Sequence, residues 1–508
     1  MWACLMWLML AWAGPPAVAD VLAGDRSAAL ALASAIGMVA LDQALADTPP
    51  DPTLLAPGRR VVLQVLPRDA ENHTVSDLRI ATTPDGTVHL AWTRTWMVAE
   101  RDHMGNNRLW KRRLWYAARS PDGTWSAPVD LGDSLDQIRL VVDRDGALLL
   151  LEGGPNLAAE PDALGTPPGH NDVRLRSLRG GEWSPAQRVI PQTSPLMHGF
   201  DAAVSPDNVV HLVWVPWFPD GPQNVPHLLR LGTGAPAEQL PSPRAVHSPV
   251  LRWTGERPVM YALGQNGDIV RMRYTPRGRG WHAEVLSGVV SSFVVAHPPP
   301  GADASMAWEA PSKGTEAAWH MQGPGTTGRL PIGPWPGSHG RTRGAIADGA
   351  SVVTWGGGVY LVARGRGEWQ TAVLRAPVRV PDAQGLATRF EDVWRVAVET
   401  DGDEVIAAWG SQGGEVAVWE GALDAAAHDW ERVRWQALAG VGLTTAERAW
   451  LGETLLLEAA ARPPEEAACL RHIVAEGLGN TGGPGYYARE QLRGAPVPSG
   501  CPASVQKP

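Results

Sequence analysis

Short runs in which apolar and polar residues alternate recur along most of the chain, and tight turns separate them. One run stops at the turn Pro84-Asp85-Gly86 and resumes in the stretch 87–92, while another is broken by Gly180-Gly181. A period of two residues is typical of a strand with one buried face, and Asp-Gly or Gly-Gly between two such runs favours a hairpin. The pattern therefore predicts an all-β chain of antiparallel hairpins.

Bulky residues end one strand of each repeat at a regular distance along the chain. They fall at Trp92, Leu150, Trp214, Tyr261, Trp308, Trp355 and Trp409, and three successive steps are 47 residues long. Self-similarity at this period, with room for four strands in each repeat, is typical of a β-propeller. We expect residues 59–440 to form seven blades, with six or eight as the alternatives. Either the strand 60–66 closes the ring, or the last blade takes its fourth strand from 430–438.

The two ends of the chain follow a helical pattern. A helix is expected over 28–45, inside a leader segment of residues 20–58. Thr444 with Glu447 forms a capping box ahead of an apolar run over 446–461, Pro463-Pro464 interrupts it, and a second run covers 465–476. Residues 441–508 are thus expected to form a helical hairpin and a tail.

The first nineteen residues resemble a secretory signal peptide. They contain an apolar stretch from Trp2 to Ala13 and the small-residue ending Ala17-Val18-Ala19. Cleavage after residue 19 would remove Cys4 and leave one pair, Cys469 and Cys501, for which a disulfide is expected in an oxidising compartment and two buried thiols are the alternative. We expect a secreted or periplasmic protein with no transmembrane segment after cleavage.

Composition limits the classes of partner. The formal net charge of −9 disfavours nucleic acid, because binding to phosphates needs a net basic field. We expect a monomer with no cofactor, and no metal, since the chain lacks a pair of histidines at a defined short spacing. Most of the 24 tryptophans stand at repeat positions, where an indole fills the space between two twisted sheets.

Loop length indicates where a site lies. The hairpins at one end of the repeats are short, whereas the other end carries insertions at 93–113, 153–172 and 215–226. Long ordered loops on a rigid scaffold commonly hold binding residues. Asp77, Asp136, Asp201 and Asp392 are expected at equivalent starts of the inner strands, where a carboxylate could bind a ligand or bond the backbone of a turn. Tryptophans outside the repeat positions, close to charged side chains, could stack on a sugar. The predicted ligand-binding residues are Asp77, Arg79, Trp96, Arg101, Asp102, His103, Trp110, His198, Asp201 and Trp217.

The stretch over 60–440 resembles the sialidase-like, Asp-box superfamily of bacterial β-propellers. The resemblance rests on DGTVHLAW and LWYAARSPDGTWSAPV, in which Ser120 to Trp125 is a contracted Asp-box. Leu78-Arg79-Ile80-Ala81 is similar to the Arg-Ile-Pro element of the catalytic members, and that similarity implies that Arg79 holds a substrate carboxylate. The family's nucleophilic Tyr and Glu pair is not identified.

Three hypotheses about function follow. The first is a propeller that binds an extracellular or envelope glycan on the long-loop face without catalysis. The second is a glycan-active hydrolase or lyase of sialidase-like type that uses Arg79 with acids such as Asp77, Asp102 or Asp201. The third is an envelope scaffold that docks proteins. Whether the protein is an enzyme is left open by the sequence.

Overall fold

The computed structural model describes sixteen stretches of the chain. They are residues 17–65, 73–190, 196–217, 224–275, 280–287, 292–295, 306–310, 318–323, 326–329, 344–347, 350–365, 368–381, 388–391, 393–412, 415–479 and 483–503.

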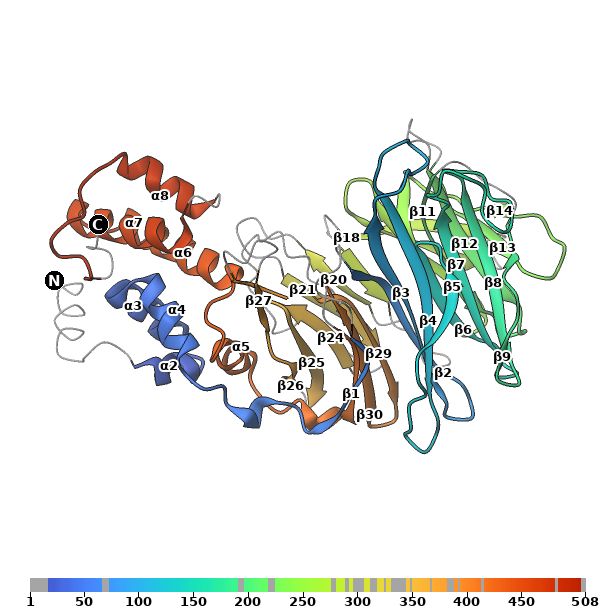
Figure 1. Ribbon diagram of the computed structural model, residues 1–508, viewed down its shortest axis with the longest axis horizontal. Helices are drawn as coiled ribbons and strands as arrows, with labels where there is room; N and C mark the ends of the chain where they lie inside the picture. The colour runs from blue at the N-terminus through green and yellow to red at the C-terminus, as the bar shows by residue number, and fades with distance from the viewer. Residues whose placement is uncertain are drawn as a thin grey trace.

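Strands dominate these residues, as the alternating pattern predicts. The described strands form six four-stranded antiparallel sheets, one five-stranded sheet and one two-stranded ribbon, numbered here as sheets 1 to 7 in chain order of their inner strands (Figure 1). Sheet 1 contains β2 (Thr74–Thr82), β3 (Val88–Val98), β4 (Leu109–Arg119) and β5 (Val129–Asp133); sheet 2 contains β6 (Gln137–Val142), β7 (Leu148–Pro155), β8 (Asn171–Arg179), β9 (Glu182–Trp183) and β10 (Gln187–Arg188); sheet 3 contains β11 (Leu196–Val204), β12 (Val210–Trp217), β13 (His227–Arg230) and β14 (Glu238–Gln239).

The later sheets repeat the same order of strands. Sheet 4 contains β15 (Val246–Thr254), β16 (Arg257–Gly264), β17 (Ile269–Thr275) and β18 (Gly280–Ser287); sheet 5 contains β19 (Ser292–Val295), β20 (Met306–Ala310), β21 (Ala318–Gly323) and β22 (Thr326–Arg329); sheet 6 contains β23 (Gly344–Ala347), β24 (Ala350–Trp355), β25 (Gly358–Gly365) and β26 (Glu368–Arg375); sheet 7 contains β29 (Val393–Asp401), β30 (Glu404–Ser411), β31 (Glu415–Ala422) and β1 (Gly58–Val65). The ribbon pairs β27 (Arg379–Pro381) with β28 (Thr388–Phe390).

Apolar side chains fill the spaces between neighbouring sheets. Trp92 of sheet 1 packs with Ile406 of sheet 7, and Phe200 of sheet 3 packs with Leu151 of sheet 2. Further clusters join sheets 1 and 2, 3 and 4, 4 and 5, and 6 and 7. The repeat positions predicted to be bulky and buried are buried at Trp92, Leu150, Trp214, Tyr261 and Trp409. The side chains of Trp308 and Trp355 lie outside the described part.

The N-terminal strand completes the last sheet. β1 pairs antiparallel with β31, so that Val61 lies opposite Val418 across 357 residues of sequence. The alternative of a fourth strand at 430–438 is wrong, because this segment forms helix α5 (Trp430–Leu438), whose first turn is capped by the Asp429 carboxylate accepting from Glu431 N. With β1 already hydrogen-bonded to β31, the segment instead packs Trp430 against Tyr360 of sheet 6 and Trp435 against Trp450 of the C-terminal helices.

The helices of both chain ends form one unit beside sheet 6 (Figure 1). The single helix expected over 28–45 is two helices, because Gly37, with a φ of 85°, ends the first and begins the second. The pair is bent by 117°, and no single helix of the described residues is long and apolar enough to cross a membrane. The helices are α2 (Val18–Leu22), α3 (Arg26–Ile36), α4 (Met38–Ala46), α5, α6 (Thr445–Ala460), α7 (Pro464–Leu478) and α8 (Pro484–Leu492), with short 3-10 turns at Pro52–Leu54 and Leu423–Ala425.

The predicted N-cap of the first C-terminal helix and the predicted disulfide are confirmed. The Thr444 hydroxyl accepts from Glu447 N at 3.0 Å at the start of α6, but the Glu447 carboxylate accepts from Arg434 Nε and Nη2 instead of completing the capping box. Cys469 on α7 is bonded to Cys501 in the tail. α8, within the Gly- and Pro-rich end, is a helix that the sequence reasoning did not expect.

Candidate functional site

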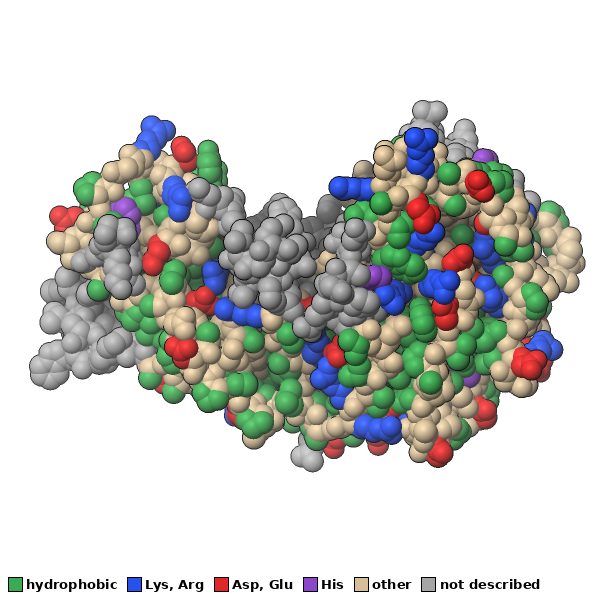
Figure 2. Space-filling model, viewed as in Figure 1, with side chains coloured by type: hydrophobic (Ala, Val, Ile, Leu, Met, Phe, Trp, Pro, Cys, Tyr) green, Lys and Arg blue, Asp and Glu red, His purple; other side chains and the backbone are tan. Residues whose placement is uncertain are grey.

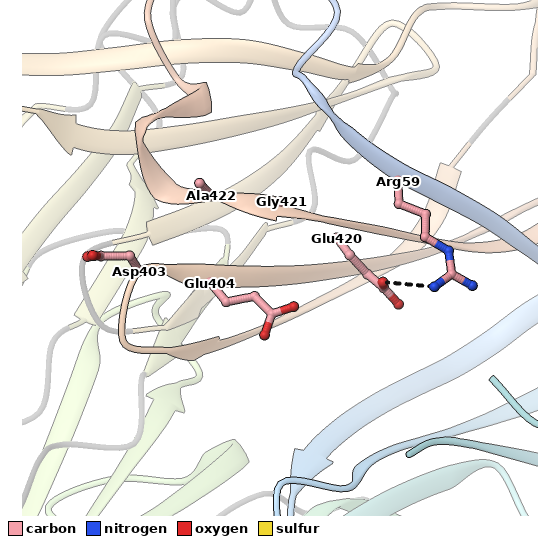
Figure 3. A pocket seen from close by; sticks show the side chains of 6 residues that line it. All are labelled: Arg59, Asp403, Glu404, Glu420, Gly421 and Ala422. Atoms are coloured by element: carbon pink, nitrogen blue, oxygen red, sulfur yellow. Dashed lines mark ion pairs between the residues drawn. The ribbon is translucent and has the colours of Figure 1, made fainter. Parts of the chain in front are cut away.

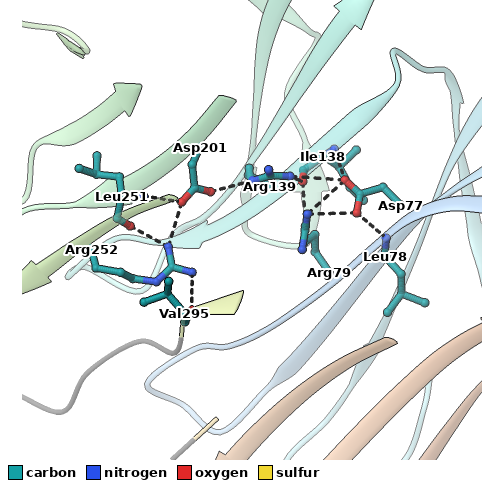
Figure 4. Close-up of polar contacts among 9 residues, drawn as sticks. All are labelled: Asp77, Leu78, Arg79, Ile138, Arg139, Asp201, Leu251, Arg252 and Val295. Carbon is teal, nitrogen blue, oxygen red and sulfur yellow. Dashed lines mark hydrogen bonds and ion pairs between the residues drawn. The ribbon is translucent and has the colours of Figure 1, made fainter. Parts of the chain in front are cut away.

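A row of alternating Arg and Asp side chains crosses the inner strands of sheets 1 to 4 (Figure 4). Its members, called the Arg–Asp belt below, are Asp77, Arg79, Arg139, Asp201 and Arg252. Asp201 lies between two guanidiniums: its Oδ1 accepts from Arg139 Nε at 2.7 Å and its Oδ2 from Arg252 Nη1 at 2.9 Å. The contacts Asp77–Arg139, Arg139–Asp201 and Asp201–Arg252 each join a different pair of neighbouring inner strands, whereas Asp77 and Arg79 pair within β2. The three contacts between strands hold the sheets together.

The two belt carboxylates also bond the backbone of the next sheet. Asp77 Oδ2 accepts from Ile138 N at 2.9 Å, and Asp201 Oδ2 accepts from Leu251 N at 2.8 Å. This confirms that the Asp residues bond backbone amides, although the amides belong to the next inner strand and not to a turn. Burial raises the pKa of Asp201, but Arg252, Arg139 and the Leu251 amide outweigh it and leave that pKa below its ordinary value. Asp201 is therefore ionised at neutral pH and placed as an acceptor.

Arg79 is the belt member that reaches furthest into solvent. Its side chain is 39% exposed although it stands on an inner strand, whereas those of Arg139 and Arg252 are 17% and 13% exposed. Although its surface is partly accessible, Arg79 is surrounded closely enough by protein that desolvation, together with the nearby Arg139, lowers its pKa to about 10, against the opposing effect of Asp77. Three guanidiniums share two carboxylates in the belt, so its net charge is positive.

A second cluster surrounds Trp96 on β3. The His73 ring stacks on the indole at 5.6 Å between centroids, and the Arg94 guanidinium lies over the same indole at 5.6 Å. Arg94 Nε donates to His73 Nδ1 at 3.1 Å. An arginine nitrogen only donates, so Nδ1 is the acceptor and the imidazole is neutral in this arrangement. The three side chains form an aromatic and cationic surface, called the Trp96 cluster below.

The two predicted loop insertions of sheets 1 and 2 pack against each other. Asp102 forms a bridge with Ala158, and His103 N donates to Leu157 O at 3.1 Å. Gly169, with a φ of +73°, lets the His103 imidazole approach, because a Cβ there would lie 3.0 Å from His103 Cδ2. The end of the sheets that carries these loops, 99–108 and 156–170, is called the long-loop end below.

Side-chain caps make both loops rigid. The Asp102 carboxylate accepts from Met104 N at 2.9 Å and from Asn106 N at 2.8 Å, and the bonds from Asn106 lower the pKa of Asp102. In the second loop, the Asn156 amide donates to Glu160 O and Thr166 O. Asp102 therefore holds its own loop in shape, which is a positioning role.

The two loop tryptophans of sheet 1 point to opposite sides of their hairpin. In the register of β3 and β4, Trp96 lies opposite Lys111, whereas Trp110 lies opposite Met97. Directly paired residues share one face and successive residues alternate, so the two indoles cannot form one platform. Trp110 is 40% exposed, while Trp96 is partly covered by its cluster.

The other predicted residues are distributed as follows. Arg101 and His103 are exposed in the loop 99–108. Asp136 does not take the position of Asp77 and Asp201, which lie within their strands. It lies immediately before the first residue of β6, and its carboxylate pairs with Arg112 at 3.3 Å. The side chains of His198 and Trp217 and all of Asp392 lie outside the described residues.

Sequence reasoning missed Arg94 and Arg252. The signal for Arg252 is present, because Leu251-Arg252 repeats the apolar-Arg pair of Leu78-Arg79 and Ile138-Arg139. For Arg94 the signal is its strand period, which puts it on the same face as the buried Trp92 and as Trp96.

The contracted Asp-box has a structural role at the contact between sheet 1 and sheet 7. Asp122 accepts from Thr124 N at 2.9 Å, and this shapes the turn whose Gly123 O accepts from Arg59 Nη1 at 2.7 Å. The Trp125 indole N–H donates to Glu420 of sheet 7. Sheet 1 and sheet 7 are thereby tied together.

A hollow of about 360 Å³ lies next to this tie (Figure 3). Arg59 and Glu420 point toward each other in it, 3.9 Å apart, and Arg119 pairs with Glu420 at 3.2 Å and with Glu404 at 2.7 Å. Its lining residues are Arg59, Asp403, Glu404, Glu420, Gly421 and Ala422. Glu420 is therefore paired with both Arg59 and Arg119, and Glu404 with Arg119.

Charged side chains of both signs are interspersed over the face seen in Figure 2. This mixture gives no broad surface of one sign there, so a charged ligand would be recognised by local groups such as the belt and the Trp96 cluster.

Comparisons with known proteins complete the description. No protein-family model matches the chain, and no curated protein matches it in sequence. Among solved structures, the chain is similar to Trypanosoma rangeli sialidase (11% identity, 79% of this chain and 63% of that one, TM-score 0.40), to an ulvan lyase of a polysaccharide lyase family (11%, 70% and 95%, 0.40) and to the β-propeller domain of the trilobed protease from Pyrococcus furiosus (11%, 70% and 98%, 0.38). With TM-scores below 0.5, these similarities carry no argument about this chain.

Proposed function

We propose that the chain is an exported, monomeric seven-bladed β-propeller that binds an extracellular or envelope glycan at its long-loop end without catalysing a reaction. The observation that carries this proposal is the Trp96 cluster: an indole, an imidazole and a guanidinium fixed on one face of the β3–β4 hairpin, on the strands that lead into a rigid loop. An aromatic face flanked by polar donors suits a sugar, whose ring stacks while its hydroxyls are hydrogen-bonded.

The seven sheets and the pairing of β1 with β31 support the blade count and the boundaries 59–440 in this proposal. The disulfide between Cys469 and Cys501 supports export, because such bonds persist in oxidising compartments. The signal peptide over 1–19 remains part of the proposal, and its first sixteen residues lie outside the described part.

The absence of catalysis is supported by the structural hydrogen bonds of the candidate acids. Asp77 and Asp201 accept from backbone amides of the next sheet, and Asp102 accepts from amides of its own loop. An acid that donates a proton to a leaving group needs a raised pKa, whereas the pKa values of Asp201 and Asp102 are lowered.

The test is a glycan-array screen of the exported protein beside two variants, Trp96→Ala and Trp110→Ala. The two tryptophans sit on adjacent positions of one hairpin but on opposite faces, so each variant controls for the other. Binding by the parent that is lost in Trp96→Ala and kept in Trp110→Ala supports the proposal. A folded parent that binds no glycan would refute it and favour the docking scaffold. Release of cleaved sugar from a bound glycan would replace it with the hydrolase or lyase alternative.

A further inference from the structure

Three cations stand on the same face of the β3–β4 hairpin as Trp96, and two of them are neutralised. Lys111 pairs with Glu100 at 2.9 Å. Arg113 pairs with Asp130 at 2.5 Å and lies 3.8 Å from Asp133. Arg94 differs: no carboxylate of the described residues lies within ion-pair distance of it, and its Nε and Nη2 are both directed at His73 Nδ1.

Arg94 lacks the carboxylate partner that its neighbours on this face have. It lies directly opposite Arg113 in the strand register, and Asp130 and Asp133 lie within ion-pair distance of Arg113 but not of Arg94. It is also partly buried, so water screens its charge incompletely. Burial lowers the pKa of Arg94, with Asp130 opposing the effect. Because no carboxylate of the described residues pairs with this partly buried guanidinium, an anion from outside would stabilise it.

The surroundings of Arg94 also fit a planar anion. The indole of Trp96 lies under the guanidinium, and His73 Nδ1 accepts from its Nε. These two contacts fix the orientation of the guanidinium N–H groups before any ligand binds. A guanidinium presents its N–H groups in a fixed geometry that matches the paired oxygens of a carboxylate or sulfate. Because the fork is already ordered, little conformational entropy is lost when it binds.

We propose that Arg94 is the anion-recognising residue of the Trp96 cluster, and that the glycan bound there is acidic, with its carboxylate or sulfate group on this guanidinium. This inference rests on the proposed glycan-binding function and names the ligand class. It assigns the role to a residue on the second strand of sheet 1, separate from Arg79 on the inner strand.

The experiment compares binding to glycans that differ only in charge. Polygalacturonate is tested against fully methyl-esterified pectin, and chondroitin sulfate against chemically desulfated chondroitin, as surface-immobilised probes within the same glycan array. The variants are Arg94→Gln, Arg94→Lys and Arg271→Gln. Arg271 pairs with Glu284 in sheet 4, so Arg271→Gln removes the same charge at a remote position.

The expected result is binding to acidic members of the array that Arg94→Gln weakens about tenfold or more, while Arg271→Gln leaves it unchanged. Arg94→Lys restores part of the affinity, since it keeps the charge and loses the fork. Arg94→Gln also removes the contacts of the guanidinium with His73 and Trp96, so the free energy of unfolding of each variant is measured beside its affinity. A role in packing alone would lower the free energy of unfolding and leave affinity unchanged.

Each other outcome decides between the two proposals. Equal binding to charged and neutral partners that is lost in Trp96→Ala but kept in Arg94→Gln leaves the glycan function standing and overturns the acidic-ligand inference. No binding to any glycan by the folded parent overturns both. If the protein discriminates the charged from the neutral glycan in just one of the two pairs, that result supports the inference and identifies the anion as a carboxylate or a sulfate.

Discussion

Asp201 and Arg139 face each other across two sheets, with 2.7 Å between Asp201 Oδ1 and Arg139 Nε, and the same carboxylate also holds Arg252 of a third sheet. Removing it takes the paired carboxylate from Arg252, which is 13% exposed, and leaves Arg139 with only Asp77 at 3.4 Å. We expect Asp201→Ala to lower the free energy of unfolding by about 3 kcal/mol or more, as for other broken buried ion pairs. Urea denaturation measures this.

The control for that variant is Asp136→Ala, which breaks a pair whose carboxylate is 41% exposed. Its cost should stay below about 1 kcal/mol, because exposed ion pairs contribute little. Equal losses in the two variants would show that the belt does not hold the sheets together.

The hydrogen bond between Trp125 and Glu420 joins sheet 1 to sheet 7. The Glu420 carboxylate is buried, accepts from the Trp125 indole and pairs with Arg119 at 3.2 Å. Glu420→Ala is expected to cost about 2 to 4 kcal/mol, and Trp125→Phe, which removes the N–H donor but keeps an aromatic ring, about 1 to 2 kcal/mol.

Hydrogen exchange measures this contact specifically. Relative to the parent protein, Glu420→Ala should increase the exchange rates of the amides of β1 and β31 more than those of sheets 3 and 4. An equal increase in all sheets would mean that Glu420 has no special part in joining sheet 7 to sheet 1. A double-mutant cycle of Glu420 and Trp125 measures their coupling.

His89 gives the protein a dependence of stability on pH. Burial lowers the pKa of His89 to about 4, with Asp85 opposing it, and the ring is held between Thr83 Oγ1 at 3.0 Å and the Tyr116 hydroxyl at 2.7 Å. Because the unfolded chain binds this proton at about pH 6.5, the stabilisation is complete above that pH and is lost as the pH falls toward 4. The loss is at most about 3 kcal/mol.

His89→Gln should therefore flatten the decline in unfolding free energy between pH 6.5 and 4. Burial also lowers the pKa of His211 to about 4, so His211→Gln should have a similar effect and the double variant a larger one. Denaturation curves at a series of pH values test this. An unchanged slope in the double variant would mean that neither histidine is buried as described.

The disulfide between Cys469 and Cys501 closes a loop of 32 residues. The chain-entropy relation assigns it about 3 to 4 kcal/mol of stabilisation. A Cys469→Ser/Cys501→Ser variant should lose that amount in unfolding followed by the helical circular-dichroism signal, and reducing agent should destabilise the parent but not the variant. Parent and variant with equal stability would argue against a bonded pair in the purified protein.

Elements whose determinants lie close together in sequence could be predicted. The helix N-cap at Thr444 depends on a residue three positions away, and the hairpin turn at Gly86, with a φ of 80°, depends on its own backbone. The buried Trp92 and Trp409 follow from strand period and spacing.

The segment 430–438 shows where such reasoning stops. Its apolar residues fit a strand at Val433, Trp435 and Ala437 and a helix at Trp430, Val433 and Ala437, so a nine-residue window does not separate the two. The strand position beside β31 is already filled by β1, from the other end of the chain. The segment therefore forms a helix because β1 occupies the only strand position beside the outer edge of β31, and this pairing between distant segments is not visible in the local sequence.

The candidate site divides in the same way. Trp96 could be singled out because it interrupts the repeat, but its opposition to Trp110 required the strand register. Likewise the sequence by itself determined the hairpins, the repeat and the cysteine pair, because period, turn chemistry and residue count are local or compositional properties. Only the tertiary structure decided that Asp201 meets Arg139 across 62 residues, that Glu420 meets Trp125 across 295, and that Arg94 lies opposite Arg113 with no carboxylate partner among the described residues. These contacts depend on how sheets pack, and packing is set by all the apolar surfaces together.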